Sequence, residues 1–139
     1  MKITTYSDHA SSIQREWHLM DANDKILGEI AVQIAHKLMG KHKPTYTANI
    51  DGGDYVIVIN AKLVAVTGNK RKDKMYYNHS GFPGGMRKES FEVVMEKDPA
   101  EIIRHAVKGM LPKNKLRDPR MNRLKVFPTA EHTYTDKLK

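Results

Sequence analysis

The sequence predicts an α/β domain built on a parallel or mixed sheet, and three stretches of the chain support this prediction. Residues 16–21 alternate in side-chain character as a strand does. Between residues 26 and 39, apolar side chains recur every three or four positions, which places them on one face of a helix. Residues 55–59 are continuously apolar, which is typical of a strand buried on both faces. Strand, helix and strand in this order are compatible with a right-handed crossover.

The length of the chain favours one domain that spans residues 1–139. A domain of this size buries roughly two thirds of its unfolded surface in a single core. Within it we expect an N-terminal arm (1–15) that lies on the domain, an α/β core with basic loops (16–127) and a polar C-terminal tail (128–139). We expect the tail to become ordered only against a partner.

Composition narrows the classes of partner. The chain has 24 Lys and Arg against 16 Asp and Glu, a formal net charge of +8, which favours nucleic acid or an anionic membrane surface. No apolar run approaches the roughly 20 residues that span a bilayer, and the first residues lack the apolar centre of a secretory signal. We therefore expect a soluble, intracellular protein. The absence of Cys excludes disulfides, thiolate metal sites and a Cys nucleophile.

The first helix, expected from about Ile26 to Met39, carries a basic cluster at its C-terminal end. Gly40 is suited to end the helix. The cluster consists of Lys37, Lys41, His42 and Lys43. Cations suit the negative end of the helix dipole, but three lysines within seven residues exceed what a cap requires, so a dipole role and phosphate contact both stay open.

A loop at residues 45–54 leads into the strand at residues 55–59, and a second short apolar run follows at Leu63–Thr67. Beyond it, basic, aromatic and glycine residues are interleaved from Gly68 to Lys88. Tyrosines can stack on bases, lysines can neutralise phosphate, and glycines let backbone amides approach a phosphate. A strand at Met75–Ser80 with its tyrosines in the core, followed by a turn, is the alternative.

Two helices and a basic segment complete the chain. Ser90 can cap a short helix, while Asp98 with Pro99 can begin a second one that buries a stripe of apolar residues up to Met110. The segment Val107–Phe127 then holds seven Lys and Arg side chains against one acid and is anchored by apolar residues, which favours a polyanion as partner. We expect its last residues, from Leu124, to form a short strand.

Five runs of this sequence, in order and in spacing, resemble the large-subunit ribosomal protein thirteen family of bacteria and organelles. The runs are GKHK at 40–43, GD at 53–54, VTGNK at 66–70, YYNHSGFPGG at 76–85 and VKGMLPKN at 107–114. The resemblance extends from about Trp17 to Phe127. It implies a three-layer α/β/α domain with a central, mostly parallel or mixed sheet of about four strands. It also implies a structural component of a bacterial cytoplasmic or organellar ribosome that binds large-subunit rRNA directly, acts early in assembly and has no catalytic role or cofactor.

The resemblance and the charge pattern together mark the candidate RNA-binding residues. They are Lys41, His42, Lys43, Asn69, Lys70, Arg71, Lys72, Tyr77, His79, Gly84, Gly85, Arg87, Lys88, Lys108, Lys113, Lys115, Arg117, Arg120 and Arg123. The chain departs from the family pattern at residues 117–120. There we expect Asp118 to cap a short helix that begins at Pro119.

Other classes of function find less support. A free regulator that binds mRNA would use the same surface, whereas neighbouring large-subunit proteins are the expected protein partners. A nucleotide-binding enzyme would need a phosphate loop, but no GxxxxGK[ST] run occurs, and Gly40 follows a helix instead of preceding one. No HxxxH or HExxH pair points to a metal. We expect neither a membrane nor a small-molecule substrate as partner.

Overall fold

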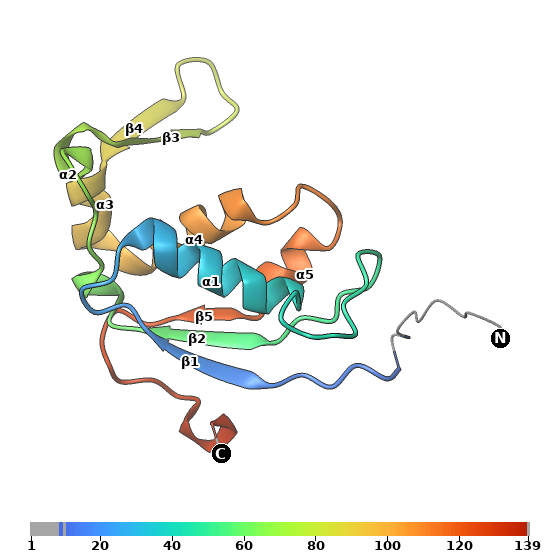
Figure 1. Ribbon diagram of the computed structural model, residues 1–139. Helices are drawn as coiled ribbons and strands as arrows, with labels where there is room; N and C mark the ends of the chain where they lie inside the picture. The colour runs from blue at the N-terminus through green and yellow to red at the C-terminus, as the bar shows by residue number, and fades with distance from the viewer. Residues whose placement is uncertain (1–8, 10, 139) are drawn as a thin grey trace, which may run out of the picture.

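The computed structural model describes residues 9 and 11–138 and has the predicted α/β organisation (Figure 1). A parallel three-stranded sheet in the order β1-β2-β5 forms its base. The strands are β1 (Trp17–Asp21), β2 (Tyr55–Ile59) and β5 (Leu124–Val126). The strands expected at residues 16–21, at residues 55–59 and from Leu124 are therefore confirmed. The parallel crossover between the first two is confirmed as well.

Helix α1 (Leu27–Met39) makes that crossover and buries its apolar stripe. Ile30, Ile34 and Leu38 are at most 1% exposed and pack in the core with β2. Gly40 ends the helix in the left-handed conformation (φ 80°), which costs glycine little because it has no Cβ. The predicted helix and its glycine stop are confirmed.

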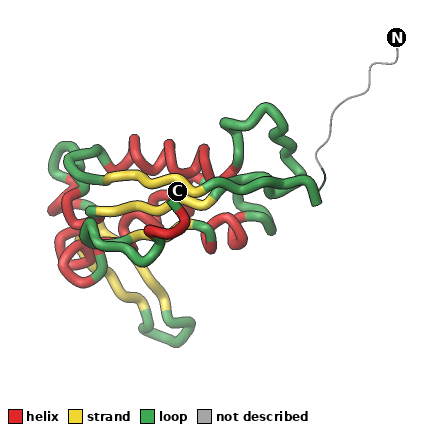
Figure 2. The backbone as a smooth tube through the Cα atoms, turned by 90° about the horizontal axis from the view of Figure 1, so that it is seen from below, coloured by secondary structure: helices red, strands yellow, loops and turns green. Residues whose placement is uncertain are grey.

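Helices α1 and α4 (Pro99–Met110) pack side by side on one face of the sheet, with α5 (Arg117–Asn122) beside them (Figure 1). The C-terminal segment, with a short 3₁₀ helix η2 (Thr135–Lys137), passes the opposite face (Figure 2). Helices on both faces were expected. On the second face, the described residues after β5 contribute this segment with its short helix η2.

Aromatic stacking holds the C-terminal segment in place. Trp17 of β1 stacks on Tyr55 of β2 at 4.2 Å between ring centroids, and Tyr134 stacks on Trp17 at 5.3 Å. Phe127 also contacts Tyr134, at 6.1 Å. The described part of the tail therefore has an aromatic contact with the domain itself, and its ordering against a partner stays a prediction.

The short apolar run at Leu63–Thr67 contains no strand. The chain forms a 3₁₀ turn, η1 (Ala61–Leu63), after Asn60 in the left-handed conformation. Among the described residues, a single isolated bridge, between Ile26 and Ala65, joins this run to another part of the chain. The left-handed turn redirects the chain before a strand can extend.

A two-stranded hairpin projects from the domain (Figure 1). Strand β3 (Met75–His79) agrees with the alternative of a strand at Met75–Ser80. Its antiparallel partner β4 (Met86–Ser90) and the short helix α2 (Lys70–Asp73) were not expected. Helix α3 (Phe91–Lys97) then leads from the hairpin to α4.

The start of α4 follows the prediction and that of α5 does not. The Asp98 carboxylate accepts a hydrogen bond from the Ala100 amide at 3.0 Å, which caps α4. Helix α5 begins at Arg117, so Asp118 lies in its first turn and is not its cap. Pro119 is tolerated at the third helical position because the first four amides of a helix have no intrahelical acceptor. Within the described residues, no helix has the length and hydrophobicity needed to cross a membrane.

Candidate nucleic-acid interface

The loop between α1 and β2, residues 40–54, is organised around one buried carboxylate. Asp54 is 0% exposed, and both of its oxygens accept hydrogen bonds. Its Oδ2 accepts from Nε2 of His18 and Nε2 of His42, each at 2.8 Å. Its Oδ1 accepts from the Lys43 ammonium and from the Glu16 amide. The carboxylate therefore joins β1, the loop and β2.

These partners determine the protonation of Asp54. Burial by itself would raise its pKa, but the hydrogen bonds from Lys43, His18 and the Glu16 amide outweigh burial and lower the pKa from 3.8 to about 2. Asp54 is therefore ionised at any physiological pH, and its negative charge stays paired with the Lys43 ammonium.

A second carboxylate in the same loop, Asp51, pairs with two of the three arginines of the basic segment. Arg123 donates from both terminal nitrogens to its two carboxylate oxygens, with the Nη2–Oδ1 distance at 2.6 Å. Arg120 Nε donates to Oδ1 at 3.3 Å. Arg123 also donates to the carbonyl oxygen of Leu38, at 3.1 Å. Burial raises the pKa of Asp51, and the Arg123 guanidinium more than offsets this, so the pKa lies below its usual value.

Four of the expected RNA-binding residues make contacts within the domain. Arg120 and Arg123 are 1% and 6% exposed and hold the loop from inside the domain. His42 and Lys43 direct their nitrogens onto Asp54, with side chains only 23% and 20% exposed. The physical reason is that a buried carboxylate requires cationic or N–H donors, and these side chains supply them. Only Lys41 of this cluster is exposed and unpaired among the described residues.

The loop between α4 and α5 lies at the same end of the molecule as the 40–54 loop (Figure 1). Lys113 and Lys115 are exposed on it, and Lys108 is exposed on the last turn of α4. The Asn114 side chain accepts a hydrogen bond from the Leu116 amide at 3.1 Å, which fixes the turn between the two lysines. Arg117 is half-buried, and its Nε has no hydrogen-bond partner within the described residues.

The second group of expected residues lies on α2 and the hairpin. All of its charged members are exposed: Lys70, Arg71, Lys72, Arg87 and Lys88, together with Asn69. Tyr77 is 63% exposed on the outer face of the hairpin, whereas Tyr76 faces inward and packs against the core. Tyr76 therefore has the core role that the sequence leaves open, and RNA contact stays a prediction for the exposed Tyr77.

The hairpin tip is shaped by glycine. Gly81 and Gly84 have φ values of +86° and +70°, which other residues rarely adopt. A Cβ on Gly85 would lie 2.0 Å from Ser80 Oγ. His79 is exposed, and its Nδ1 accepts a hydrogen bond from the Gly81 amide at 2.9 Å, which leaves Nε2 free to donate. The tip therefore has one defined shape to present to a ligand.

The sequence did not identify His18, Arg15 and Asp51 as residues that hold the 40–54 loop in place. Arg15 donates to the Gly53 carbonyl at 2.7 Å and so fixes the end of the N-terminal arm, whose residues 1–8 and 10 lie outside the described part. His18, His42 and Asp54 place three potential metal-binding atoms within 4.8 Å of one another. The ammonium of Lys43 occupies the other carboxylate oxygen, however, and its charge opposes a divalent cation at this position.

Comparison with known proteins gives a consistent result. The model of the family described as Ribosomal protein L13 matches residues 15–133. A large ribosomal subunit protein uL13 of Dehalococcoides mccartyi is 50% identical over 132 residues, which cover 95% of this chain and 92% of the relative. Proteins of the same name from Herpetosiphon aurantiacus and Legionella pneumophila are 51% and 50% identical over 94% of this chain, covering 90% and 91% of those relatives. The match spans the sheet, the hairpin and both basic loops, and the chain belongs to the ribosomal protein L13 family.

Proposed function

We propose that this protein is a structural constituent of the large ribosomal subunit in a bacterial cytoplasm and that it binds large-subunit rRNA directly. The observation that carries the proposal is the set of exposed cations on two loops that buried ion pairs hold in place. Its family and the name of its bacterial relatives support the same conclusion. We propose no catalytic role.

The mechanism follows from the division between exposed and buried charge. Exposed Lys and Arg side chains neutralise phosphates and release counterions. The buried pairs of Asp51 and Asp54 prevent the 40–54 loop from rearranging when RNA binds, so less ordering entropy is lost. The hairpin tip supplies exposed aromatic and backbone groups that fit a folded RNA. Recognition then depends more on RNA shape than on base sequence.

Residues on the two faces of the hairpin differ in role within this proposal. The outer face, with Tyr77 opposite Lys88, suits RNA contact, and Phe82 at the tip is 73% exposed. An early role in subunit assembly is consistent with a domain whose binding loops are ordered before RNA binds. No contact among the described residues favours a message as ligand, so a free mRNA-binding regulator is not proposed.

The salt dependence of binding to large-subunit rRNA tests the proposal. Replacing Lys113 and Lys115 by Ala should reduce the slope of log affinity against log salt by about two units, roughly one for each phosphate that is no longer neutralised. A matched control replaces the exposed Lys25 and Lys62, which removes the same charge from positions that we do not assign to RNA. The control should leave the slope nearly unchanged. Equal slopes for both variants would contradict the assignment of this loop.

Sedimentation tests the cellular role. The native protein should remain with the large ribosomal subunit after a wash at high salt. Recovery only in free fractions would contradict a structural role and would favour a free regulator.

A further inference from the structure

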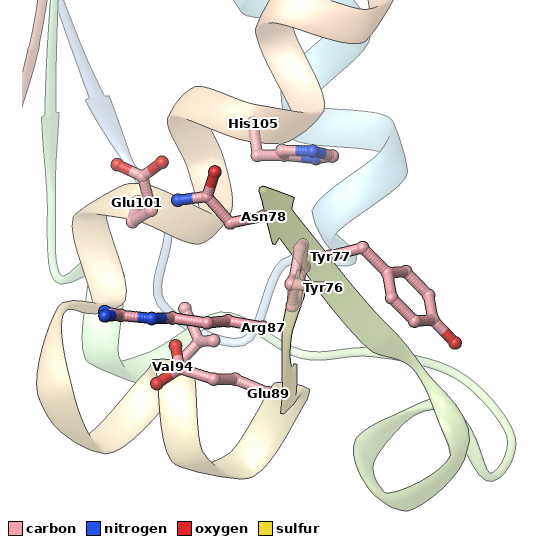
Figure 3. Close-up of a pocket in the computed structure, with 8 residues that line it drawn as sticks. All are labelled: Tyr76, Tyr77, Asn78, Arg87, Glu89, Val94, Glu101 and His105. Atoms are coloured by element: carbon pink, nitrogen blue, oxygen red, sulfur yellow. The ribbon is translucent and has the colours of Figure 1, made fainter. Parts of the chain in front are cut away.

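A pocket separates the inner face of the hairpin from α4 (Figure 3). Its volume is about 380 Å³, within the usual range for small-ligand sites. Tyr76 and Asn78 of β3 and Arg87 of β4 line it from the hairpin, while Glu101 and His105 line it from α4. Figure 3 shows Asn78 and Arg87 extending from the hairpin on the side of α4 and Tyr77 extending away from it. The strand alternation explains this arrangement, because Asn78 pairs with Arg87 and their side chains share one face.

The pocket has aromatic walls that suit a planar ligand. The Tyr76 ring meets the His105 ring edge-on at 5.2 Å between centroids, and it also packs at 6.4 Å from Phe91. Burial raises the pKa of Tyr76, so its hydroxyl stays protonated and can donate. The residues behind Tyr76 belong to the core, and the ring therefore has a fixed position.

The polar groups of the pocket have complementary hydrogen-bonding characters. The Arg87 guanidinium only donates, the Glu101 carboxylate only accepts, and the Asn78 amide does both. Among the described residues, none of these three side chains has a hydrogen-bond or ion-pair partner within the chain. The other carboxylate at the pocket, Glu89, is paired with Lys97. Glu101 is therefore the acceptor left for a ligand.

This chemistry suits a nucleobase better than a phosphate. A phosphate would be repelled by Glu101 and Glu89, and the exposed lysines that suit phosphate lie elsewhere on the hairpin and on α2. Among the bases, guanine presents two adjacent donors, N1–H and the 2-amino group, which match one carboxylate. Its O6 and N7 acceptors match guanidinium or amide donors. Adenine, cytosine and uracil place an acceptor or a single donor where the carboxylate would need two donors.

We propose that the pocket between the hairpin and α4 binds one unpaired guanine of the RNA, with Glu101 accepting from its N1–H and 2-amino edge and with Arg87 and Asn78 donating to its acceptors. This assignment rests on the proposed function, because the bound RNA is the molecule that would supply the base. It adds one base-specific contact to a surface that otherwise recognises phosphate and shape.

Nucleosides without phosphate test the pocket separately from the basic loops. Titration of the full chain with guanosine, followed by NMR, should shift the Asn78 side-chain amide and the His105 ring signals. Inosine lacks the 2-amino group and should bind roughly tenfold more weakly, and adenosine should also bind more weakly. Equal shifts from all nucleosides, or no shift at Asn78 and His105, would overturn the assignment.

Variants assign the specificity to Glu101. Replacing Glu101 by Gln keeps the size of the side chain but removes the bidentate acceptor, so guanosine affinity should fall about tenfold and the preference over inosine should disappear. Glu96→Gln, an exposed carboxylate on α3, is the matched control and should change neither. In rRNA binding, Glu101→Gln should lower affinity without changing the salt slope. If the protein bound guanosine but not rRNA, only the proposed function would be contradicted. If it bound rRNA but not guanosine, only the assignment of the pocket to guanine would be contradicted.

Discussion

At the scale of single residues, the meaning of a charged side chain in this protein depends on its partner. Lys41 and Lys43 are two positions apart in one basic run, yet Lys41 is exposed and Lys43 holds a buried carboxylate. Lys43 also donates to the carbonyl oxygens of Gln14 and Gly52, so it joins the arm, the loop and β2. Its replacement would change the shape of the surface as well as its charge.

The buried Asp54 gives a prediction about stability and pH. Its pKa in the folded protein, about 2, lies below the ordinary 3.8, so its stabilising contribution is complete above about pH 4 and is lost as the pH falls toward 2. The corresponding loss is about 2 kcal/mol. Urea denaturation at pH 7, 5, 4 and 3 should show the onset of this loss.

Replacing Asp54 by Asn should lower the free energy of unfolding at pH 7 by about 3 kcal/mol, because the Lys43 ammonium loses its buried counter-charge. Between pH 4 and pH 3, the free energy of unfolding of the variant should also decline less than that of the wild type. Asp136→Asn, at an exposed position in the tail, is a control of equal charge change. If wild type and Asp54→Asn declined in parallel with pH, the assigned pKa would be wrong.

At the scale of elements, two segments outside the sheet owe their positions to specific contacts. The C-terminal segment depends on the stacking of Tyr134 over Trp17, and the 40–54 loop depends on a close approach between Gly53 and α1. Each contact joins residues that are distant in sequence. Both contacts therefore belong to the tertiary structure and are testable by single substitutions.

Tyr134→Ala should uncover Trp17, the single tryptophan of the chain. The emission of Trp17 should shift to longer wavelength, and the free energy of unfolding should fall by about 1 kcal/mol because the stacking is removed. Tyr77→Ala, at an exposed tyrosine of the hairpin, serves as control and should change neither. Unchanged Trp17 emission in Tyr134→Ala would show that the tail does not cover the sheet.

Gly53→Ala should destabilise the protein strongly, by roughly 3 kcal/mol or more, since its Cβ would lie 1.7 Å from the Leu38 carbonyl oxygen. Gly28→Ala is the matched control. A Cβ at this position of α1 would have nothing within 4 Å, so the change should stabilise by roughly 0.5–1 kcal/mol through helix propensity. Thermal unfolding measures both changes. Similar melting temperatures for the two variants would contradict the close packing of loop and helix.

At the scale of the whole molecule, the exposed cations form two groups. One lies on the loops after α1 and α4, and the other lies on α2 and the hairpin, away from the first (Figure 1). A single folded RNA that binds both groups would contact the domain from two sides. The buried arginines of α5 and its C-terminal end lie beneath the first group and support it.

This arrangement predicts additivity in rRNA binding. Lys70→Ala with Lys72→Ala, on α2, should reduce the salt slope by about two units, and combining them with Lys113→Ala and Lys115→Ala should reduce it by about four. Arg123→Ala should instead lower the free energy of unfolding and leave the slope nearly unchanged, because its charge is paired with Asp51. A full loss of slope from either pair alone would indicate that only one group contacts RNA.

Local patterns in the sequence were sufficient for much of the fold. The apolar spacing of α1, the glycine after it and the Asp98–Pro99 start of α4 act over a few residues, and each was confirmed. Lys113 and Lys115 are exposed, as contact with RNA requires, and that contact stays a prediction. Apolar content does not reveal the left-handed turn at Asn60, which redirects the chain before the apolar run at Leu63–Thr67.

Periodicity and composition are properties of short stretches, and they were enough to predict the α/β class, the excess of positive charge and its placement in loops. They could not predict which of these charges are available to a ligand, because that depends on pairs that form only when the chain folds. Arg123 meets Asp51 across 72 positions, and His18 meets Asp54 across 36, and no local pattern encodes such pairs. The pocket between the hairpin and α4 also depends on folding, because its lining residues come from separate parts of the chain.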